Sequence, residues 1–92
     1  MEFEWDEVKR RINIQKHGID FRSVVEAFDS PMVYALDPRL GYGEDRWIGI
    51  GLARGRLLTI VYTERKSDSI RIISARKANR YEKEKYRAQV PN

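Results

Sequence analysis

Residues 46–77 read RWIGIGLARGRLLTIVYTERKSDSIRIISARK, and this stretch carries the clearest structural pattern of the chain. Its β-branched and other apolar residues fall into three runs, which predict strands at 46–53, 57–63 and 69–75. Short polar turns at 54–55 and 66–68 separate the runs. Such short connections favour consecutive hairpins, so we expect an antiparallel meander.

The first of these strands has an unusually uneven pair of faces. Large apolar side chains at 48, 50 and 52 share one face, while Trp47, Gly49 and Gly51 share the other. The two glycines predict a hollow above the sheet. Either a helix packs closely there or a bound chain occupies it.

The residues before the meander predict a short extended segment at 2–5 and two helices. Asp6 is a good N-cap for a helix over 7–17, which ends at Gly18, the residue type that most easily adopts the left-handed conformation. Asp20 begins a second helix, in which apolar residues at 21, 24, 25 and 28 form a core face. Residues 29–31 end it, and a strand at 32–36 leads into a turn-rich loop at 37–45.

The residues after the meander predict a polar helix at 79–89. Asn79 and Glu82 have the spacing of a capping box, but few apolar residues follow them. The expected order is therefore β-α-α-β-β-β-β-α, an α+β fold with the helices on one side of an antiparallel sheet. We expect the whole chain, 1–92, to form a single domain.

The composition excludes several classes of protein. Hydrophobic residues make up 41% and charged residues 35%, and no apolar run approaches about 18 residues, which excludes a long disordered tail and a membrane protein. With no cysteine and one histidine, the sequence offers no disulfide, thiol nucleophile or zinc ligand set, so we expect no metal and no cofactor. The first residues lack the pattern of a secretory signal, so we expect a cytoplasmic protein.

The charge of the chain is unevenly distributed. Residues 1–61 contain nine basic and ten acidic residues, whereas residues 62–92 contain nine basic and four acidic residues. A localised positive field attracts polyanions, so nucleic acid is the expected partner. A solvated helix face is the alternative explanation for these charges.

Two separate motifs resemble the BrnT family of toxins. They are FEWDEVKRRINIQKHGIDF at 3–21 and RIISARKANRYEKEKY at 71–86. The residues that carry the resemblance are Trp5, Asp6, Lys9, Asn13, Lys16, His17, Gly18 and Phe21 in the first motif, and Arg71, Ser74, Ala75, Arg76, Arg80, Glu82 and Tyr86 in the second. The resemblance implies a RelE-like fold and a growth-inhibiting endoribonuclease of a type II toxin-antitoxin pair. It also implies a ribbon-helix-helix antitoxin of the BrnA type, in a 2:2 complex that contacts operator DNA only through the antitoxin.

Cleavage of RNA without a metal requires a base, an acid and a cation that stabilises the charged phosphorane. Arginine suits the last role, because its planar fork binds two phosphate oxygens and stays protonated. Arg76 is the first candidate, since it ends the last strand, where a side chain reaches solvent and a phosphate together. Strict alternation predicts that residues 70, 72, 74 and 76 share one face of this strand, and that residues 71, 73, 75 and 77 share the other. A structural pair with Glu82 or Glu64 is the alternative role for Arg76.

Four further residues are catalytic candidates. Arg65 ends the preceding strand and lies close to Arg76 if the hairpin is tight, and an exposed turn cation is the alternative. His17 is the one side chain that titrates near neutral pH, which suits a general acid or base, although the helix dipole also favours histidine at the end of a helix. Glu64 and Glu82 are candidate bases, and each has cations nearby for a salt bridge.

The expected RNA-binding residues combine positive charge with aromatic rings that stack on bases. They are Lys16, Arg46, Trp47, Lys77, Arg80, Tyr81, Lys85 and Tyr86. Burial against the sheet is the alternative for the aromatic residues, above all for Tyr86 and Trp47.

Two other functions stay open from the sequence: a ParE-type toxin that acts on gyrase, and a nucleic-acid-binding module without catalysis. We expect an antitoxin to inhibit by occupying the hollow above Gly49 and Gly51 together with the flank of the last helix. The basic residues expected to face an acidic segment of this partner are Arg76, Lys77, Arg80, Lys83, Lys85 and Arg87.

Overall fold

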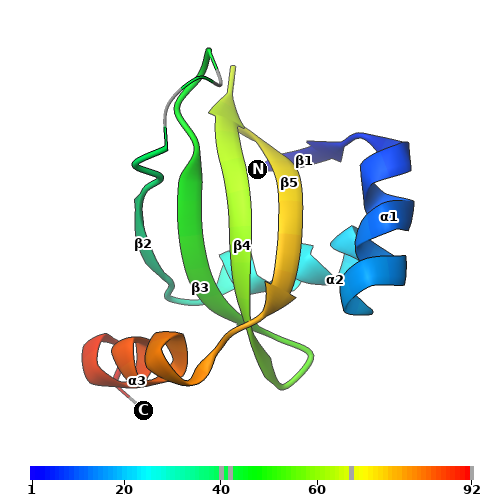
Figure 1. The fold of residues 1–92 in the computed structure, drawn as a ribbon. Coiled ribbons are helices and arrows are strands. Elements are labelled where there is room, and N and C mark those ends of the chain that lie inside the picture. Colours follow the sequence, from blue (N-terminus) through cyan, green and yellow to red (C-terminus); the bar gives the residue numbers. More distant parts are fainter. Residues whose placement is uncertain (40, 42, 67, 92) are drawn as a thin grey trace.

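The computed structural model describes residues 1–39, 41, 43–66 and 68–91 (Figure 1). The elements follow one another as strand β1 (Glu2–Trp5), helices α1 (Glu7–His17) and α2 (Phe21–Val24), the 3-10 helix η1 (Val25–Asp29), strands β2 (Val33–Leu36), β3 (Trp47–Ala53), β4 (Arg56–Arg65) and β5 (Ser69–Lys77), and helix α3 (Arg80–Gln89). The strands form one sheet in the order β1-β5-β4-β3-β2. Neighbouring strands are antiparallel except β1 and β5, which are parallel. The expected mixed α and β architecture is confirmed.

The turns of the meander follow the sequence. Arg54 and Gly55 both have positive φ, 52° and 75°, as a two-residue hairpin turn requires. The second expected turn, 66–68, includes residue 67, which lies outside the described residues. The loop at 37–45 likewise includes residues 40 and 42, which lie outside them.

Helix α1 begins and ends where its capping residues predict. The Asp6 side chain accepts hydrogen bonds from the backbone N–H groups of Val8 and Lys9, and Gly18 ends the helix with a φ of 70°. The second expected helix is correct in position, but only its first turn is α-helical and the remainder is the 3-10 helix η1. Tightening into a 3-10 turn is common at helix ends, and here Pro31 follows two residues later.

Asn13 of α1 closes the edge of β5. Strand β1 pairs only with residues 69–72 of β5, so the later part of that strand has no neighbour on this side. There the Asn13 carboxamide accepts from the N–H of Ala75 at 3.1 Å and donates to its carbonyl at 2.8 Å. The amide also donates to the carbonyl of Ile19 at 2.9 Å. One buried side chain therefore takes the place of a neighbouring strand.

The core lies between the sheet and the layer formed by α2 and η1, which Figure 1 shows behind the strands. Phe21, Val24 and Ala27 are fully buried against the inward side chains of β4 and β5. A Cβ atom on Gly49 would lie 2.6 Å from Met32 Cε, and one on Gly51 would lie 3.1 Å from Ala27 Cβ. The glycines thus allow close packing of this layer, and the expectation that an antitoxin fills the hollow above them is wrong.

A β-bulge in β5 changes which residues share a face. The register with β4 shifts between Val61 and Tyr62, and Ile73 is the extra residue. Ala75 is therefore buried on the same side as residues 70 and 72. Arg76 and Arg71 pair with residues 59 and 63, which share the other face of β4. The prediction from strict alternation is wrong beyond residue 73, and both arginines lie on the face opposite the core.

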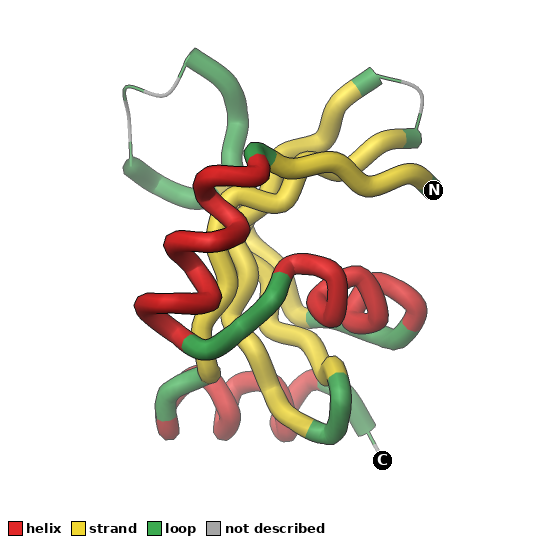
Figure 2. The backbone as a smooth tube through the Cα atoms, turned by 90° about the vertical axis from the view of Figure 1, so that its right-hand side faces the viewer, coloured by secondary structure: helices red, strands yellow, loops and turns green. Residues whose placement is uncertain are grey.

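Helix α3 lies on this second face and not beside α2 and η1. Glu82 binds Arg76, and Tyr81 and Lys85 line a small gap together with outward residues of β3, among them Ile50. Figure 2 shows the helices on different sides of the sheet, so the expected placement of all helices on one side is wrong. None of the residues of α3 is buried, and its Asn79–Glu82 capping box is present as predicted. Among the described residues, no helix is long and apolar enough to cross a membrane.

Candidate active site

The candidate residues divide between two ends of the sheet. Arg65 pairs with Ser69 where β5 begins, and Arg76 pairs with Thr59 near the end of β5. Seven residues of extended chain separate these positions, about 20 Å at roughly 3.3 Å per residue. The expectation that Arg65 lies close to Arg76 is wrong, because Arg76 is at the far end of β5 from the turn. We call the two regions the upper end, near Arg65, and the lower end, near Arg76, as they appear in Figure 1.

At the lower end, Arg76 is held by Glu82. Two guanidinium nitrogens donate to the two carboxylate oxygens, each at 2.8 Å, and one also donates to the carbonyl of Lys77 at 3.2 Å. Glu82 has 15% of its side chain exposed and Arg76 has 43%. The guanidinium holds the pKa of Glu82 down at about 2, and the Asn79 N–H and Thr59 hydroxyl contribute to this. The structural pair considered as the alternative role for Arg76 is therefore present.

His17 also lies toward the lower end. Helix α1 runs in the same direction as β5, and Asn13 is bonded to Ala75 (Figure 1). His17 follows Asn13 by one helical turn, about 6 Å along the axis, which brings it level with the end of β5 that carries Arg76. The ring is half-buried, and the preceding Lys16 is exposed.

The candidates on and before α3 point outward to different degrees. Tyr81 is 71% exposed and Tyr86 is half-buried, as the burial alternative for Tyr86 predicts. Arg80 is exposed and pairs with Glu84 one turn later at 3.2 Å. Lys77 and Lys85 are exposed as well. The lower end therefore gathers most of the expected RNA-binding residues.

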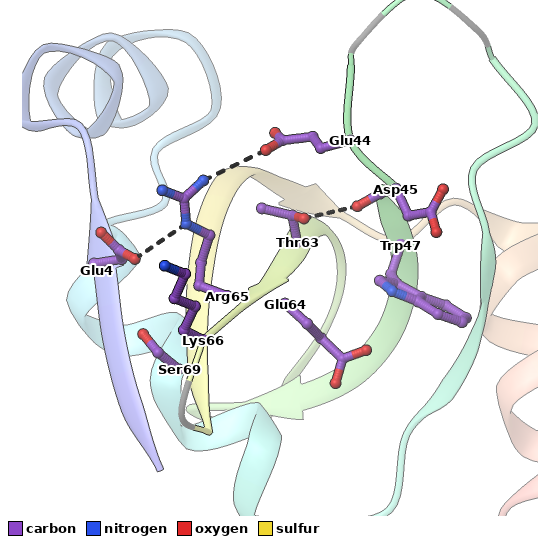
Figure 3. Close-up of a pocket in the computed structure, with 9 residues that line it drawn as sticks. All are labelled: Glu4, Glu44, Asp45, Trp47, Thr63, Glu64, Arg65, Lys66 and Ser69. Atoms are coloured by element: carbon purple, nitrogen blue, oxygen red, sulfur yellow. Dashed lines mark hydrogen bonds and ion pairs between the residues drawn. The ribbon is translucent and has the colours of Figure 1, made fainter.

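The upper end holds the largest cleft described, about 720 Å³ in volume (Figure 3). Arg65 lies between Glu4 at 3.6 Å and Glu44 at 3.5 Å, so its charge is shared by two carboxylates. Asp45 and Glu64 also line the cleft, and the cations among its described lining residues are Arg65 and Lys66. Four carboxylates and two cations make this cleft an unfavourable place for a polyanion.

The other upper-end candidates differ in exposure, and Glu64 is exposed. Figure 3 shows the Glu64 side chain directed away from Arg65. Burial raises the pKa of Tyr62 to about 12, and the charge of Glu64 adds to this. Trp47 packs edge to face on Tyr34, with ring centroids 5.9 Å apart, and contacts the core. Arg46 is mostly buried and lies 3.8 Å from Glu44.

The lower end holds a smaller cleft, about 430 Å³, with the opposite charge. It lies between the β3–β4 turn, the end of β5 and α3. Among the described residues, the charged side chains that line it are cations, with no carboxylate: Arg56, Lys77, Lys83 and Arg87, next to Tyr86. Arg56 was not expected from the sequence, because its place beside Lys77 depends on the pairing of β4 with β5. Among the described residues, no three histidine, aspartate or glutamate side chains are grouped as metal ligands.

A basic cleft beside a fixed arginine is the arrangement expected of a protein that binds a phosphodiester chain. The chain belongs to the BrnT family: the family model described as "Ribonuclease toxin, BrnT, of type II toxin-antitoxin system" matches residues 5–82. The crystal structure of the Brucella abortus ribonuclease toxin BrnT is similar, with 33% identity and a TM-score of 0.67, covering 87% of this chain and 99% of that one. No curated protein matched the chain. Membership makes the chain a ribonuclease toxin with an antitoxin partner, so the gyrase-directed and non-catalytic alternatives are set aside.

Proposed function

We propose that the chain cleaves RNA without a metal, with Arg76 stabilising the transition state and His17 transferring a proton. The observation that carries the proposal is the Arg76 guanidinium, held by both carboxylate oxygens of Glu82 at the end of the sheet where cations line the surface. A donor that is fixed before the substrate binds needs no reorganisation when negative charge develops on the phosphorane. His17, toward the same end, carries an imidazole, the side chain that most often transfers protons in enzymes.

The reaction is a transesterification. A base takes the proton of the ribose 2′-hydroxyl, whose oxygen attacks the adjacent phosphorus and forms a pentacoordinate phosphorane. The P–O bond to the next ribose then breaks, and an acid protonates the departing 5′-oxygen. The products carry a 2′,3′-cyclic phosphate and a 5′-hydroxyl.

Glu82 orients Arg76 in this proposal and does not act as the base. A carboxylate with a pKa of about 2 is a weak base at neutral pH, where an effective catalyst has a pKa close to 7. Arg65 and Glu64 lie outside the reacting centre, because about 20 Å of strand separates them from Arg76. Arg46 and Trp47 also lie toward the upper end, since Trp47 pairs with Tyr62 of β4.

Two variants separate catalysis by Arg76 from its structural pair. Arg76→Ala should lower the rate of RNA cleavage by about a hundredfold or more, since loss of one donor to the transition state has this effect. Glu82→Gln loses the bidentate pair but keeps Arg76 and an oxygen that can accept from Asn79, so it should lower the rate less than Arg76→Ala does. Both are measured on a labelled RNA in excess EDTA, with circular dichroism as the check on folding. Equal loss of activity in the two folded variants would mean that Arg76 serves only as the structural partner of Glu82 and does not stabilise the transition state.

The RNA contacts that we propose beside this centre are Lys16, Lys77, Arg80, Tyr81, Lys85 and Tyr86. These residues are exposed or half-buried at the lower end, which supports the proposal. The aromatic rings would stack on bases and the cations would meet phosphates.

For the antitoxin, we propose the ribbon-helix-helix BrnA type in a 2:2 complex, with operator DNA contacted only through the antitoxin. We also propose a cytoplasmic location, where its RNA substrate is found. Inhibition would follow from covering the flank of α3, since its cations are exposed. Mass measurement of the co-purified complex checks the stoichiometry.

A further inference from the structure

The cleft at the lower end gathers four cations that lack carboxylate partners. The neighbouring arginines of this region are paired, Arg76 with Glu82 and Arg80 with Glu84. Within the part of the chain that the structure describes, the charged groups of these four side chains make no ion pair and no hydrogen bond. The four are Arg56, Lys77, Lys83 and Arg87. Their charges therefore remain available for a ligand.

The elements that carry these cations are fixed to one another. The N–H of Ala78 donates to the carbonyl of Leu57 at 3.0 Å, which ties the end of β5 to the start of β4. The Glu26 carboxylate accepts from the N–H of Arg54 and holds the β3–β4 turn against η1. Arg76 near the end of β5 donates to both carboxylate oxygens of Glu82, which holds α3 against the sheet. The cleft is thus formed by a hairpin, a strand end and a helix whose positions are set by the fold.

Cations on three elements around one cleft produce a local positive potential that recruits anions. Lys83, Tyr86 and Arg87 are three and four residues apart on α3 and so share one face of the helix. An aromatic ring between two cations can stack on a base of a nucleic-acid strand while the cations bind its phosphates. The ligand indicated by this lining is a chain of phosphodiesters.

We propose that the cleft of Arg56, Lys77, Lys83 and Arg87 binds the phosphate backbone of the RNA substrate on one side of the scissile bond. The proposal rests on the proposed function, because Arg76 binds Glu82 of α3 and the next residues along these two elements, Lys77 and Lys83, line the cleft. This continuity with Arg76 favours RNA over an acidic segment of the antitoxin as the occupant.

The test measures binding apart from cleavage. A fluorescent single-stranded RNA with 2′-O-methyl groups cannot undergo the proposed attack, and its affinity for the purified full chain is followed by anisotropy at several salt concentrations. The double variant Arg56→Gln/Lys83→Gln should bind at least about tenfold more weakly. The slope of log affinity against log salt should fall by about 1.4, since each phosphate contact to a single strand contributes about 0.7.

The matched control is Lys9→Gln/Arg11→Gln, which removes the same charges from exposed positions of α1. It should change the affinity by less than about twofold, because the screening length at physiological salt is about 8 Å. Equal weakening by the two double variants would overturn the cleft as a site and leave only net charge. Weaker antitoxin binding with unchanged RNA binding would make the cleft a protein-docking surface and would also overturn the proposal. Failure of the wild type to cleave RNA in EDTA would refute the proposed mechanism and leave the binding result intact.

Discussion

Replacing Asn13 by alanine tests how the edge of the sheet is closed. The side chain is 5% exposed and makes three hydrogen bonds, two with the backbone of Ala75 and one with the carbonyl of Ile19. Without the amide, one N–H and two carbonyls are buried without a partner, and each such group costs about 1–3 kcal/mol. Because water reaches some of these groups at a sheet edge, we expect the free energy of unfolding to fall by about 3–4 kcal/mol in total.

Urea denaturation followed by circular dichroism measures this loss. For a domain of this size the same change lowers Tm by roughly 15–30 °C. Gln15→Ala is the matched control, since Gln15 is exposed on the same helix and should change the stability by less than about 0.5 kcal/mol. Asn13→Asp should be as damaging as alanine, because the carboxylate keeps the acceptor but loses both donors and is buried. A fall below about 1 kcal/mol in Asn13→Ala, with an unchanged m-value, would refute the role of Asn13 as a substitute strand.

Two further outcomes follow from the packing and the ion pairs. The pKa of Glu82 lies below its ordinary value of 4.5, at about 2, so the stabilisation from its pair with Arg76 is present above about pH 4.5 and is lost as the pH falls toward 2. In Glu82→Gln, Tm should decline less steeply as the pH falls over that range. A profile of Tm against pH identical to that of the wild type would contradict the assignment of this pH dependence to the Arg76–Glu82 pair. Gly51→Val should lower the free energy of unfolding by about 1–3 kcal/mol, because the new side chain overpacks against Met32 and Ala27. Urea denaturation measures this loss, with Leu52→Val as the control, since the side chain of Leu52 is 43% exposed. A Gly51→Val variant with wild-type stability would contradict this, because the layer of α2 and η1 would then accommodate the larger side chain without loss of stability.

The parts of the fold that the sequence predicts well are those set by local chemistry. Asp6 and Gly18 fix the ends of α1 through a side-chain acceptor and a left-handed residue, and both interactions involve only neighbours along the chain. The Asn79–Glu82 capping box is local in the same way. The β3–β4 hairpin follows from a two-residue turn between apolar runs. None of these features requires knowledge of a distant part of the chain.

The predictions that proved wrong depend on contacts between distant segments. Strict alternation assumes an unbroken strand, but the extra residue Ile73 reverses the pattern after it. The hollow above Gly49 and Gly51 is a property of β3 alone, whereas Met32 and Ala27 come from other segments to fill it. The face on which α3 packs is decided by the Arg76–Glu82 bond and not by the few apolar residues of the helix.

The candidate residues were chosen for their chemistry, and the fold decides which of them meet. The sequence predicted that Arg65 lies close to Arg76 if the hairpin is tight, but the antiparallel register places the two residues at opposite ends of the sheet. The sequence does predict the excess of positive charge after residue 61. It does not predict that Arg56, from the acidic first part of the chain, joins Lys77 at the same cleft.

The Arg76–Glu82 pair links the position of α3 to the state of the proposed reacting centre. Glu82 accepts from the N–H of Asn79 in the capping box with the same Oε1 that accepts from Arg76. No residue of α3 is buried, so the helix depends on this pair and on shallow contacts with β2 and β3 more than on a core of its own. A partner that displaced α3 would therefore release the Arg76 guanidinium and would also remove Lys83 and Arg87 from the cleft. In this protein an antitoxin could inhibit through α3 without contacting the scissile phosphate at all.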